Sequence, residues 1–238
     1  ISAAEKHQND IVRVYFSDKA PYAPKQRQCL VEHTRDVLNK PSSVTSINRS
    51  AVKQSRSLGA VDRTYRLAVA VTGEYGAYHG GTTESALAAV ATTVNRVNGI
   101  FQRELSVQFQ LIDDNDSLIY VDPETDPFTG NDDTEILIDE SQSVIDDVVG
   151  SGAYDVGHTF STGDGGLARV GPCVDSDKAR GVSGLSNPVG DSFDVDFVAH
   201  ELGHQFGMNH TFNSLLCLEN RTATAAFEPG SGTTIMGY

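Results

Sequence analysis

The pattern of hydrophobic and polar positions divides the chain near residue 60. Before that point the sequence is weakly periodic and ends in the polar, Ser-rich segment KPSSVTSINRSAVKQSRSLGA, which is typical of a linker. After it, YRLAVAVTG predicts a buried strand that starts at Tyr65, and TESALAAVATTVNRVNGIF predicts a helix with Thr82 or Thr83 as its N-cap. We therefore expect an N-terminal extension or pro-segment over residues 1–60 and a folded domain over residues 61–238.

Strand and helix patterns continue to alternate through the second part of the chain. LSVQFQLID alternates apolar and polar residues, and DDTEILIDESQSVIDDVVG has the period of an amphipathic helix that ends at Gly150. YDVGHTF and GGLARVG predict two further strands, and SFDVDFVAHELGHQF predicts a third helix capped by Asp191 or Ser192. This order predicts an α/β fold in which a mixed sheet packs against helices.

Composition and charge argue against two classes of partner. The chain has 18 Lys and Arg residues against 32 Asp and Glu residues, a net charge of −14, so it lacks the basic surface that binds phosphate backbones. It contains no apolar run of the length, about 18 residues, that a membrane-spanning helix needs. We expect neither nucleic acid nor a membrane as a partner.

The acidic residues concentrate in one segment. Between Leu105 and Gly157 there is no Lys, Arg or His. Acidic side chains crowd one part of this segment: Asp113, Asp114, Asp116, Asp122, Glu124, Asp126, Asp132, Asp133 and Glu135. Two interpretations remain open, a solvated surface and a calcium-binding loop, and no EF-hand pattern supports the second.

The segment HELGHQFGMNH carries the clearest chemical pattern. His200 and His204 are four residues apart, so a helix presents both imidazoles on one face, about one turn apart. Gly207 can take the positive φ that turns the chain back, which delivers His210 as a third nitrogen ligand. Three neutral imidazoles leave the fourth position of a zinc ion open for water, as in catalytic zinc sites. Glu201 would then act as the general base that takes a proton from this water.

Three other interpretations compete with hydrolysis at a zinc site. Histidines on a helix are often ordinary solvated side chains, but the chain has only seven histidines, and the expected number of chance matches to the extended pattern is far below one. A catalytically silent binding module of the same fold has no reason to keep Glu201. A zinc peptidase whose third ligand is a downstream glutamate is disfavoured by His210.

The same residues carry a resemblance to a known family. HELGHQFGMNH resembles the signature of the metzincin zinc endopeptidases, and TIMGY is similar to their Met-turn, with Met236 beneath the metal. YDVGHTFSTGDGGLARVGPC, followed by the zinc helix, resembles the reprolysin (adamalysin-like) branch and its secreted bacterial relatives. The resemblance covers residues 65–238 and implies a secreted, monomeric zinc endopeptidase that acts on proteins or peptides.

For the fold, the resemblance implies a metzincin-like α/β (α+β) catalytic domain over residues 61–238. Such a domain has a twisted mixed sheet with long helices, the zinc helix at the cleft and the Met-turn at the C-terminus. The resemblance also implies an edge strand over residues 166–170, on which Gly166, Leu167 and Ala168 bind substrate by β-augmentation.

The chain departs from the family pattern at its C-terminal end. Thr211 stands where reprolysins usually have Asp, and Tyr238 follows Met236 by two positions, as in astacins and serralysins. Tyr238 is therefore either a contact to the zinc or the oxyanion, or a packed side chain of the Met-turn. In the family, residues after the Met-turn form the wall of the specificity pocket, so we expect the catalytic domain to be truncated here.

Three cysteines allow three single pairings and leave one thiol over: Cys29, Cys173 and Cys217. The resemblance implies a disulfide between Cys173 and Cys217, because the cysteine that follows GLARVG is bonded in reprolysins. In several metzincin families a pro-segment cysteine ligates the zinc and keeps the enzyme latent. Cys29 is therefore either a fourth zinc ligand or a free or buried thiol.

Overall fold

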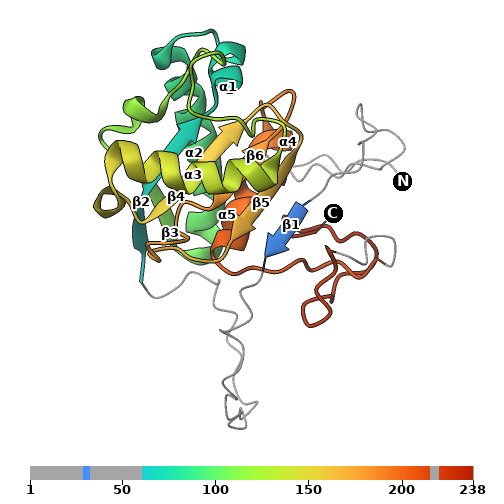
Figure 1. Cartoon of the computed structure of the whole chain (residues 1–238). Helices are drawn as coiled ribbons and strands as arrows, with labels where there is room; N and C mark the ends of the chain where they lie inside the picture. Colours follow the sequence, from blue (N-terminus) through green and yellow to red (C-terminus); the bar gives the residue numbers. More distant parts are fainter. Residues whose placement is uncertain (1–28, 33–60, 215–219, 238) are drawn as a thin grey trace, which may run out of the picture.

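Six strands form one mixed sheet in the part of the chain that the computed structural model describes, which is residues 29–32, 61–214 and 220–237. Their order is β1-β5-β6-β4-β2-β3 (Figure 1). The strands are β1 (Cys29–Glu32), β2 (Arg63–Val71), β3 (Val107–Leu111), β4 (Val156–Ser161), β5 (Gly165–Arg169) and β6 (Gly181–Gly184). β2 pairs in parallel with β3 and β4, and β4 with β6, whereas β5 runs antiparallel to β6.

Helices cover both faces of this sheet. α3 lies across one face, and α2 and α5 lie on the other (Figure 1). None of the helices in the described ranges is both long and apolar enough to cross a membrane. The predicted α/β fold with a mixed sheet is confirmed. The helices are α1 (Gly73–Tyr78), α2 (Thr83–Leu105), α3 (Thr134–Val149), α4 (Asp191–Phe193) and α5 (His200–Gln205), with the π-helical segment η3 (Asp194–Ala199) and the 3-10 turns η1 (Asn115–Leu118) and η2 (Ser151–Ala153).

The central strand β2 is buried on both faces. Leu67, Val69 and Val71 pack into one core cluster with α2 and α5, and the alternate residues Ala68 and Ala70 pack into a second cluster with α3. All five are at most 1% exposed. Because successive side chains of a strand point to opposite faces, a strand covered on both sides needs an unbroken apolar run. This is the pattern that predicted a buried strand here.

Local signals set the ends of the two long helices as expected. The Thr82 hydroxyl oxygen accepts a hydrogen bond from the backbone N–H of Ser85, so Thr82 rather than Thr83 is the N-cap of α2. α3 ends at Gly150, whose φ is 82°. A positive φ is one that glycine adopts without steric cost, which makes it a frequent helix terminator.

The predicted cap of the third helix, Asp191 or Ser192, is wrong. Gly190, with φ 70°, occupies the N-cap position of α4, and no side chain caps this end. The carboxylate of Asp191 instead accepts a hydrogen bond from Nε of Arg96 on α2, at 2.8 Å. From α4 the backbone continues through η3 into α5, so the element predicted as one helix consists of three consecutive helical segments.

The sequence prediction missed the short strands β1 and β6, the short helix α1 and the two 3-10 turns. β6 reads GVSG and has no alternation of apolar and polar residues, because all four residues are buried between β4 and β5. α1 has only six residues, too few to show a helical period. Its N-cap, Thr72, accepts a hydrogen bond from the N–H of Tyr75.

The prediction that β5 is an edge strand is also wrong. β5 pairs with β6 on one side and in parallel with β1 on the other, so the edge of the sheet is β1. The paired positions are Cys29 with Gly166, then Leu30 to Glu32 with Leu167 to Arg169. Residues 29–32, which belong to the predicted N-terminal extension, therefore pair with β5, the strand that was predicted to bind substrate. The boundary between extension and domain near residue 60 stays a prediction.

A buried polar network connects the sheet to α5. His158 of β4 is fully buried; its Nδ1 and Nε2 atoms lie 2.9 Å from Oε1 of Gln205 and 2.9 Å from Oγ of Ser183. The Gln205 side-chain amide donates to the carbonyl of Gly157 at 2.9 Å. A Cβ at Gly181 would lie 2.7 Å from Nδ1 of His158, so glycine makes room for this network. The network anchors α5 to the sheet one residue after His204.

Candidate metal centre

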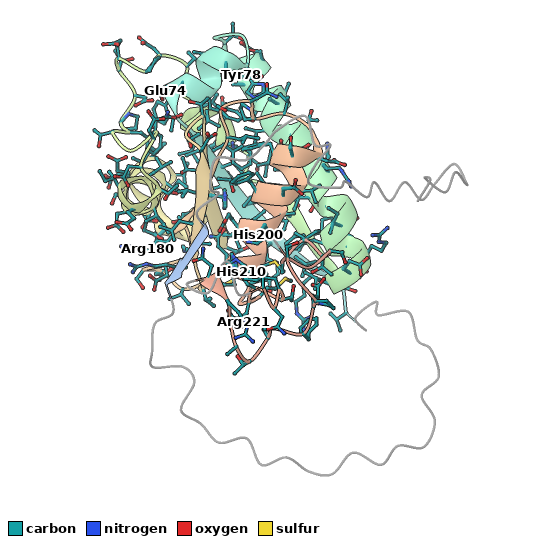
Figure 2. All side chains as sticks on the ribbon, turned by 90° about the vertical axis from the view of Figure 1, so that its right-hand side faces the viewer. Glu74, Tyr78, Arg180, His200, His210 and Arg221 are labelled. Carbon is teal, nitrogen blue, oxygen red and sulfur yellow. The ribbon has the colours of Figure 1, made fainter. Side chains whose placement is uncertain are left out.

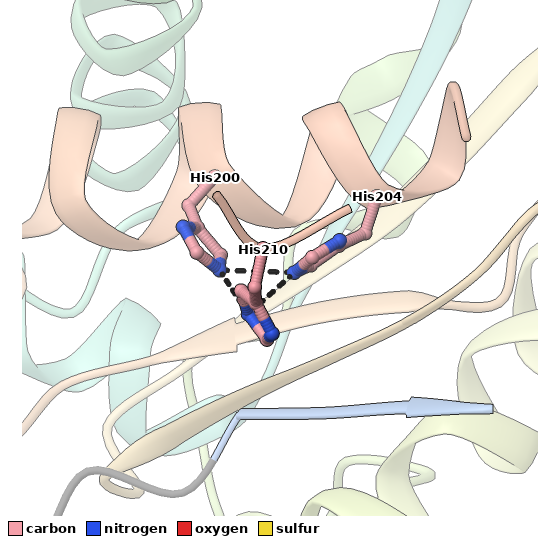
Figure 3. Close-up of side chains that lie close together, drawn as sticks. All are labelled: His200, His204 and His210. Carbon is pink, nitrogen blue, oxygen red and sulfur yellow. Dashed lines mark hydrogen bonds between the residues drawn. The ribbon is translucent and has the colours of Figure 1, made fainter. Parts of the chain in front are cut away.

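Three buried histidines converge on one point beside α5. His200 and His204 lie on α5, and His210 follows in the next loop. Their Nε2 atoms are 2.9, 3.1 and 3.2 Å apart (Figure 3). Gly207 makes the connecting turn with φ 85°, a left-handed conformation that favours glycine. His200, on α5, and His210 lie close together, with their ring centroids 5.2 Å apart (Figure 2). The structure thus brings together the three ligands that the spacing predicts.

Backbone carbonyls fix the tautomer of each ring. Nδ1 of His200 lies 2.6 Å from the carbonyl oxygen of Ile235, Nδ1 of His204 lies 2.7 Å from that of Met208, and Nδ1 of His210 lies 2.6 Å from that of Asn220. A carbonyl only accepts hydrogen bonds, so each Nδ1 carries the proton and donates. In the neutral ring this leaves Nε2 as the ligand atom.

The donor set fits a zinc ion. Zn–N bonds of about 2.0 to 2.1 Å in a tetrahedron place ligand nitrogens roughly 3.3 to 3.4 Å apart. The observed separations are slightly shorter, so a small outward shift of the rings accommodates the ion. Burial, together with the nearby His210, lowers the pKa of His200 to about 4, although the Ile235 carbonyl opposes this shift. At neutral pH the ring is therefore in the form that binds metal.

The side chain of Glu201 extends from α5 to β5. It follows the first histidine ligand and is 1% exposed. A Cβ atom at Gly166 would lie 2.6 Å from Cδ and 2.7 Å from Cγ of Glu201, closer than real Cβ atoms approach other heavy atoms. Glycine at position 166 therefore lets β5 pass directly beside the carboxylate. Glu201, the predicted base, and Gly166, the first predicted substrate residue, therefore pack against each other.

The other two predicted substrate residues, Leu167 and Ala168, have buried side chains. Leu167 belongs to the core cluster that includes α3. Any pairing of a peptide with this part of β5 therefore uses backbone groups, as β-augmentation requires.

Met236 packs beneath α5. It is 7% exposed, and a Cβ atom at Gly203 would lie 2.9 Å from its Sδ atom. Gly203 stands between the two helical histidines, so its missing side chain lets the methionine approach the helix below the metal ligands. The Met236 carbonyl also accepts a hydrogen bond from the N–H of Thr211, at 3.1 Å.

Sequence reasoning missed Gly203 and the three carbonyls that orient the rings. The glycine could have been noticed as the one residue of H-E-L-G-H without a side chain. The carbonyls of Ile235, Met208 and Asn220 have no sequence signal, because every residue has a backbone carbonyl.

The structure describes only some of the remaining predicted site residues, which are the three cysteines and Tyr238. Cys173 carries a free, exposed thiol at φ 63°, so the predicted Cys173–Cys217 disulfide is not formed in this structure. Its N–H instead donates to the carbonyl of Asp155, which holds it in the loop after β5. Cys217 and Tyr238 lie outside the described residues. For Cys29 the structure gives the backbone position, opposite Gly166.

The acidic segment shows no support for a calcium site. Among the residues described, the three histidines form the one group of three or more His, Cys, Asp or Glu side chains that could hold a metal ion. Several carboxylates instead cap local backbone: Asp122 accepts from the N–H of Glu124, Asp126 from that of Phe128, and Asp133 from the first turn of α3. Such caps are common in surface loops, and the choice between a solvated surface and a calcium-binding loop stays a prediction.

The mixed α/β sheet and the three converging histidines agree with the predicted metzincin-like fold. The sequence comparison assigns the family: residues 61–238 match metallo-peptidase family M12B, reprolysin-like. The chain therefore belongs to the reprolysin-like M12B metallopeptidases, a family that implies zinc at the three histidines.

The chain is also similar to a solved structure. Among solved structures, the chain is similar to the crystal structure of myroilysin, with 16% identity and a TM-score of 0.33, over 66% of this chain and 50% of that one. The chain thus spans half the length of the myroilysin chain. A comparison with curated proteins found no match.

Proposed function

We propose that this protein is a secreted zinc endopeptidase that hydrolyses peptide bonds in proteins or peptides. The observation that carries the proposal is the convergence of three Nε2 atoms, 2.9 to 3.2 Å apart, next to the helix that also carries the buried Glu201. Membership of the M12B family supports the peptidase chemistry. Secretion rests on the resemblance to secreted bacterial reprolysin-like proteins.

The three histidines would hold the zinc through Nε2 while their Nδ1–H groups stay bonded to backbone carbonyls. Bound zinc supplies a Lewis acid that lowers the pKa of water and polarises a peptide carbonyl. Glu201 takes the proton of the attacking water and passes it to the nitrogen of the leaving amine. Glu201 follows His200 on α5, and its buried side chain packs against Gly166 of β5.

We propose that substrates bind in an extended conformation along β5. The buried side chains of Leu167 and Ala168 leave the backbone of this strand as the pairing surface. A peptide strand paired with β5 passes Gly166, the residue against which Glu201 packs. The scissile bond would therefore lie near the register position of Gly166.

The test of this function is Glu201→Gln, which keeps the size of the side chain and removes the base. We expect full zinc content by metal analysis and a loss of casein turnover of about 10²- to 10⁴-fold, because the ligands remain while proton transfer is lost. A variant with near-normal turnover would refute the role of Glu201. A wild-type protein that binds zinc but cleaves no substrate after removal of its N-terminal segment would favour a silent binding module.

We also propose that residues 1–60 keep the enzyme latent. The supporting observation is that β1 pairs with β5, the strand on which substrate would bind, and that Cys29 stands opposite Gly166. Ten of the 18 Lys and Arg residues lie in residues 1–60, so this segment complements the acidic remainder of the chain. Cys29 is the soft donor available in this segment to fill the fourth position of zinc.

A further inference from the structure

The side chain of Glu228 is the centre of a dense hydrogen-bond cluster close to the metal ligands. Its Oε1 atom accepts from the Thr211 hydroxyl at 2.5 Å and from the Thr234 hydroxyl. Its Oε2 atom accepts from the backbone N–H groups of Thr233 and Thr234 at 2.7 and 3.2 Å. With the Thr233 hydroxyl, 3.5 Å from Oε2, five donors face this carboxylate. Hydrogen bonds to an ionised group are about twice as strong as neutral ones.

The backbone around Glu228 connects the same segments. The N–H of Glu228 donates to the carbonyl of Thr211 at 2.9 Å, and the N–H of Asn213 donates to the carbonyl of Glu228 at 2.9 Å. The N–H of Thr211 donates to the carbonyl of Met236 at 3.1 Å. Glu228 thus joins the segment that follows His210 to the segment that contains the Met-turn.

Both joined segments touch the metal site. Thr211 directly follows the third ligand, His210. Residues Thr233 and Thr234 directly precede Ile235, whose carbonyl accepts from Nδ1 of His200 at 2.6 Å. One carboxylate therefore sets the position of the third ligand relative to the carbonyl that orients the first.

We infer that Glu228 is a positioning residue of the metal centre, which holds His200 and His210 at the separation that the ion requires. This inference rests on the proposed zinc site. Hydrogen-bond partners that orient metal ligands contribute about 10- to 100-fold to metal affinity. A hydroxyl at position 211 suits this arrangement, because it donates to Glu228, whereas a carboxylate there would repel it.

The hydrogen-bond donors around the Glu228 carboxylate determine which substitutions test its role. Glu228→Gln keeps the size of the side chain but replaces one acceptor oxygen by an NH₂ group. If that group takes the place of Oε2, the contacts from the N–H groups of Thr233 and Thr234 are lost. If it takes the place of Oε1, the hydroxyls of Thr211 and Thr234 can turn to accept from it, but the negative charge that strengthens the whole cluster is gone. Thr211→Val removes one donor and keeps the shape of the side chain.

The experiment measures zinc affinity of the full chain by competition with a chelator of known affinity, and records the visible spectrum of the Co²⁺-loaded protein. We expect Glu228→Gln to weaken zinc binding by about 10- to 100-fold and to change the Co²⁺ spectrum, because the ligand geometry is loosened. Thr211→Val should weaken zinc binding in the same direction, and the double variant should lose less than the product of the two single losses, because both remove the same contact.

Glu140→Gln is the matched control. Glu140 also organises a loop, since its carboxylate accepts from the N–H groups of Thr129 and Gly130 and from the Thr129 hydroxyl, but it lies on α3, away from the histidines. We expect it to lower thermal stability while leaving zinc affinity and the Co²⁺ spectrum unchanged.

Zinc affinity and melting temperature together distinguish a positioning role of Glu228 from a purely structural one. If Glu228→Gln and Glu140→Gln both lower the melting temperature and neither changes zinc affinity, Glu228 has only a structural role and the inference is overturned. If the unaltered protein binds no zinc at the three histidines, the proposed function fails, and the inference fails with it. Weaker zinc binding in Glu228→Gln alone supports it.

Discussion

At the scale of single residues, the packing of this site depends on two glycines, which have no side chain. Gly203 admits Met236 beneath α5, and Gly166 admits the carboxylate of Glu201 beside β5. Both glycines have ordinary backbone conformations, since neither is among the residues with positive φ. Space, rather than backbone freedom, is the physical reason for glycine at these two positions.

Gly166→Ala tests this reason. The added methyl group would lie 2.6 Å from Cδ of Glu201, and the buried glutamate has little room to move away. We expect zinc content to stay full, because no ligand is touched, and kcat/KM to fall about 10²-fold through displacement of the base. Gly99→Ala on α2 is the control: a Cβ there meets nothing within 4 Å, so turnover should not change. Equal activity of the two variants would contradict the prediction.

At the scale of elements, the N-terminal strand β1 is the element whose position bears on regulation. It forms the edge of the sheet and pairs in parallel with β5 over four positions. A substrate strand and β1 would compete for the same backbone groups of β5. Latency would then combine two effects, the occupation of β5 by β1 and a bond from Cys29 to the metal.

Cys29→Ser separates these two effects. If the thiolate of Cys29 ligates zinc, the variant should have higher basal activity or faster autoprocessing, because serine is a much poorer zinc ligand. The Co²⁺-loaded wild type should show a sulfur-to-metal charge-transfer band that the variant lacks. Cys173→Ser is the control, since Cys173 carries a free thiol in the loop after β5, and it should behave as wild type. Unchanged basal activity and an unchanged spectrum in Cys29→Ser would leave only the occupation of β5 as a source of latency.

At the scale of the whole molecule, hydrogen bonds between buried polar groups connect the sheet to the helices packed on it. His158 of the sheet and Gln205 of α5 form one such hydrogen bond, and both residues are fully buried. Burial is the main reason why the pKa of His158 falls from 6.5 to about 4, although its hydrogen bond with Gln205 opposes the shift. The folded protein therefore keeps this ring neutral at a pH where the unfolded chain is already protonated.

This shift predicts a loss of stability in acid. Below pH 6.5 the unfolded chain binds a proton at His158 that the folded protein does not bind, so the free energy of unfolding falls until about pH 4 and then levels off. The contribution is about 3 kcal/mol, since one pKa unit corresponds to 1.36 kcal/mol. Urea unfolding of wild type and His158→Asn from pH 7 to pH 4, at one zinc concentration, measures it. The variant should be less stable at pH 7 and should show a shallower pH dependence; parallel curves for the two proteins would contradict the assignment.

Much of the fold was predictable because its signals are local. The apolar run of β2 and the caps Thr82 and Gly150 each depend on neighbours in sequence, and the structure agrees with them. The cap at Asp191 failed because a distant partner, Arg96, takes up its carboxylate. The edge position of β5 failed because the pairing of β1 with it spans more than 130 residues of chain, a separation that no local pattern records.

The sequence by itself predicted that His200, His204 and His210 converge, because a spacing of four on a helix places two side chains on one face and a glycine turn returns the third to it. Only the tertiary structure decided how the site is held. The carbonyls of Ile235 and Asn220 orient two rings, Gly166 makes space for the Glu201 carboxylate, and Glu228 joins Thr211, which follows His210, to Thr234. The carbonyls are backbone groups, which residue identity does not encode. The partners of Gly166 and Glu228 lie elsewhere in the sequence and meet them only in the folded chain.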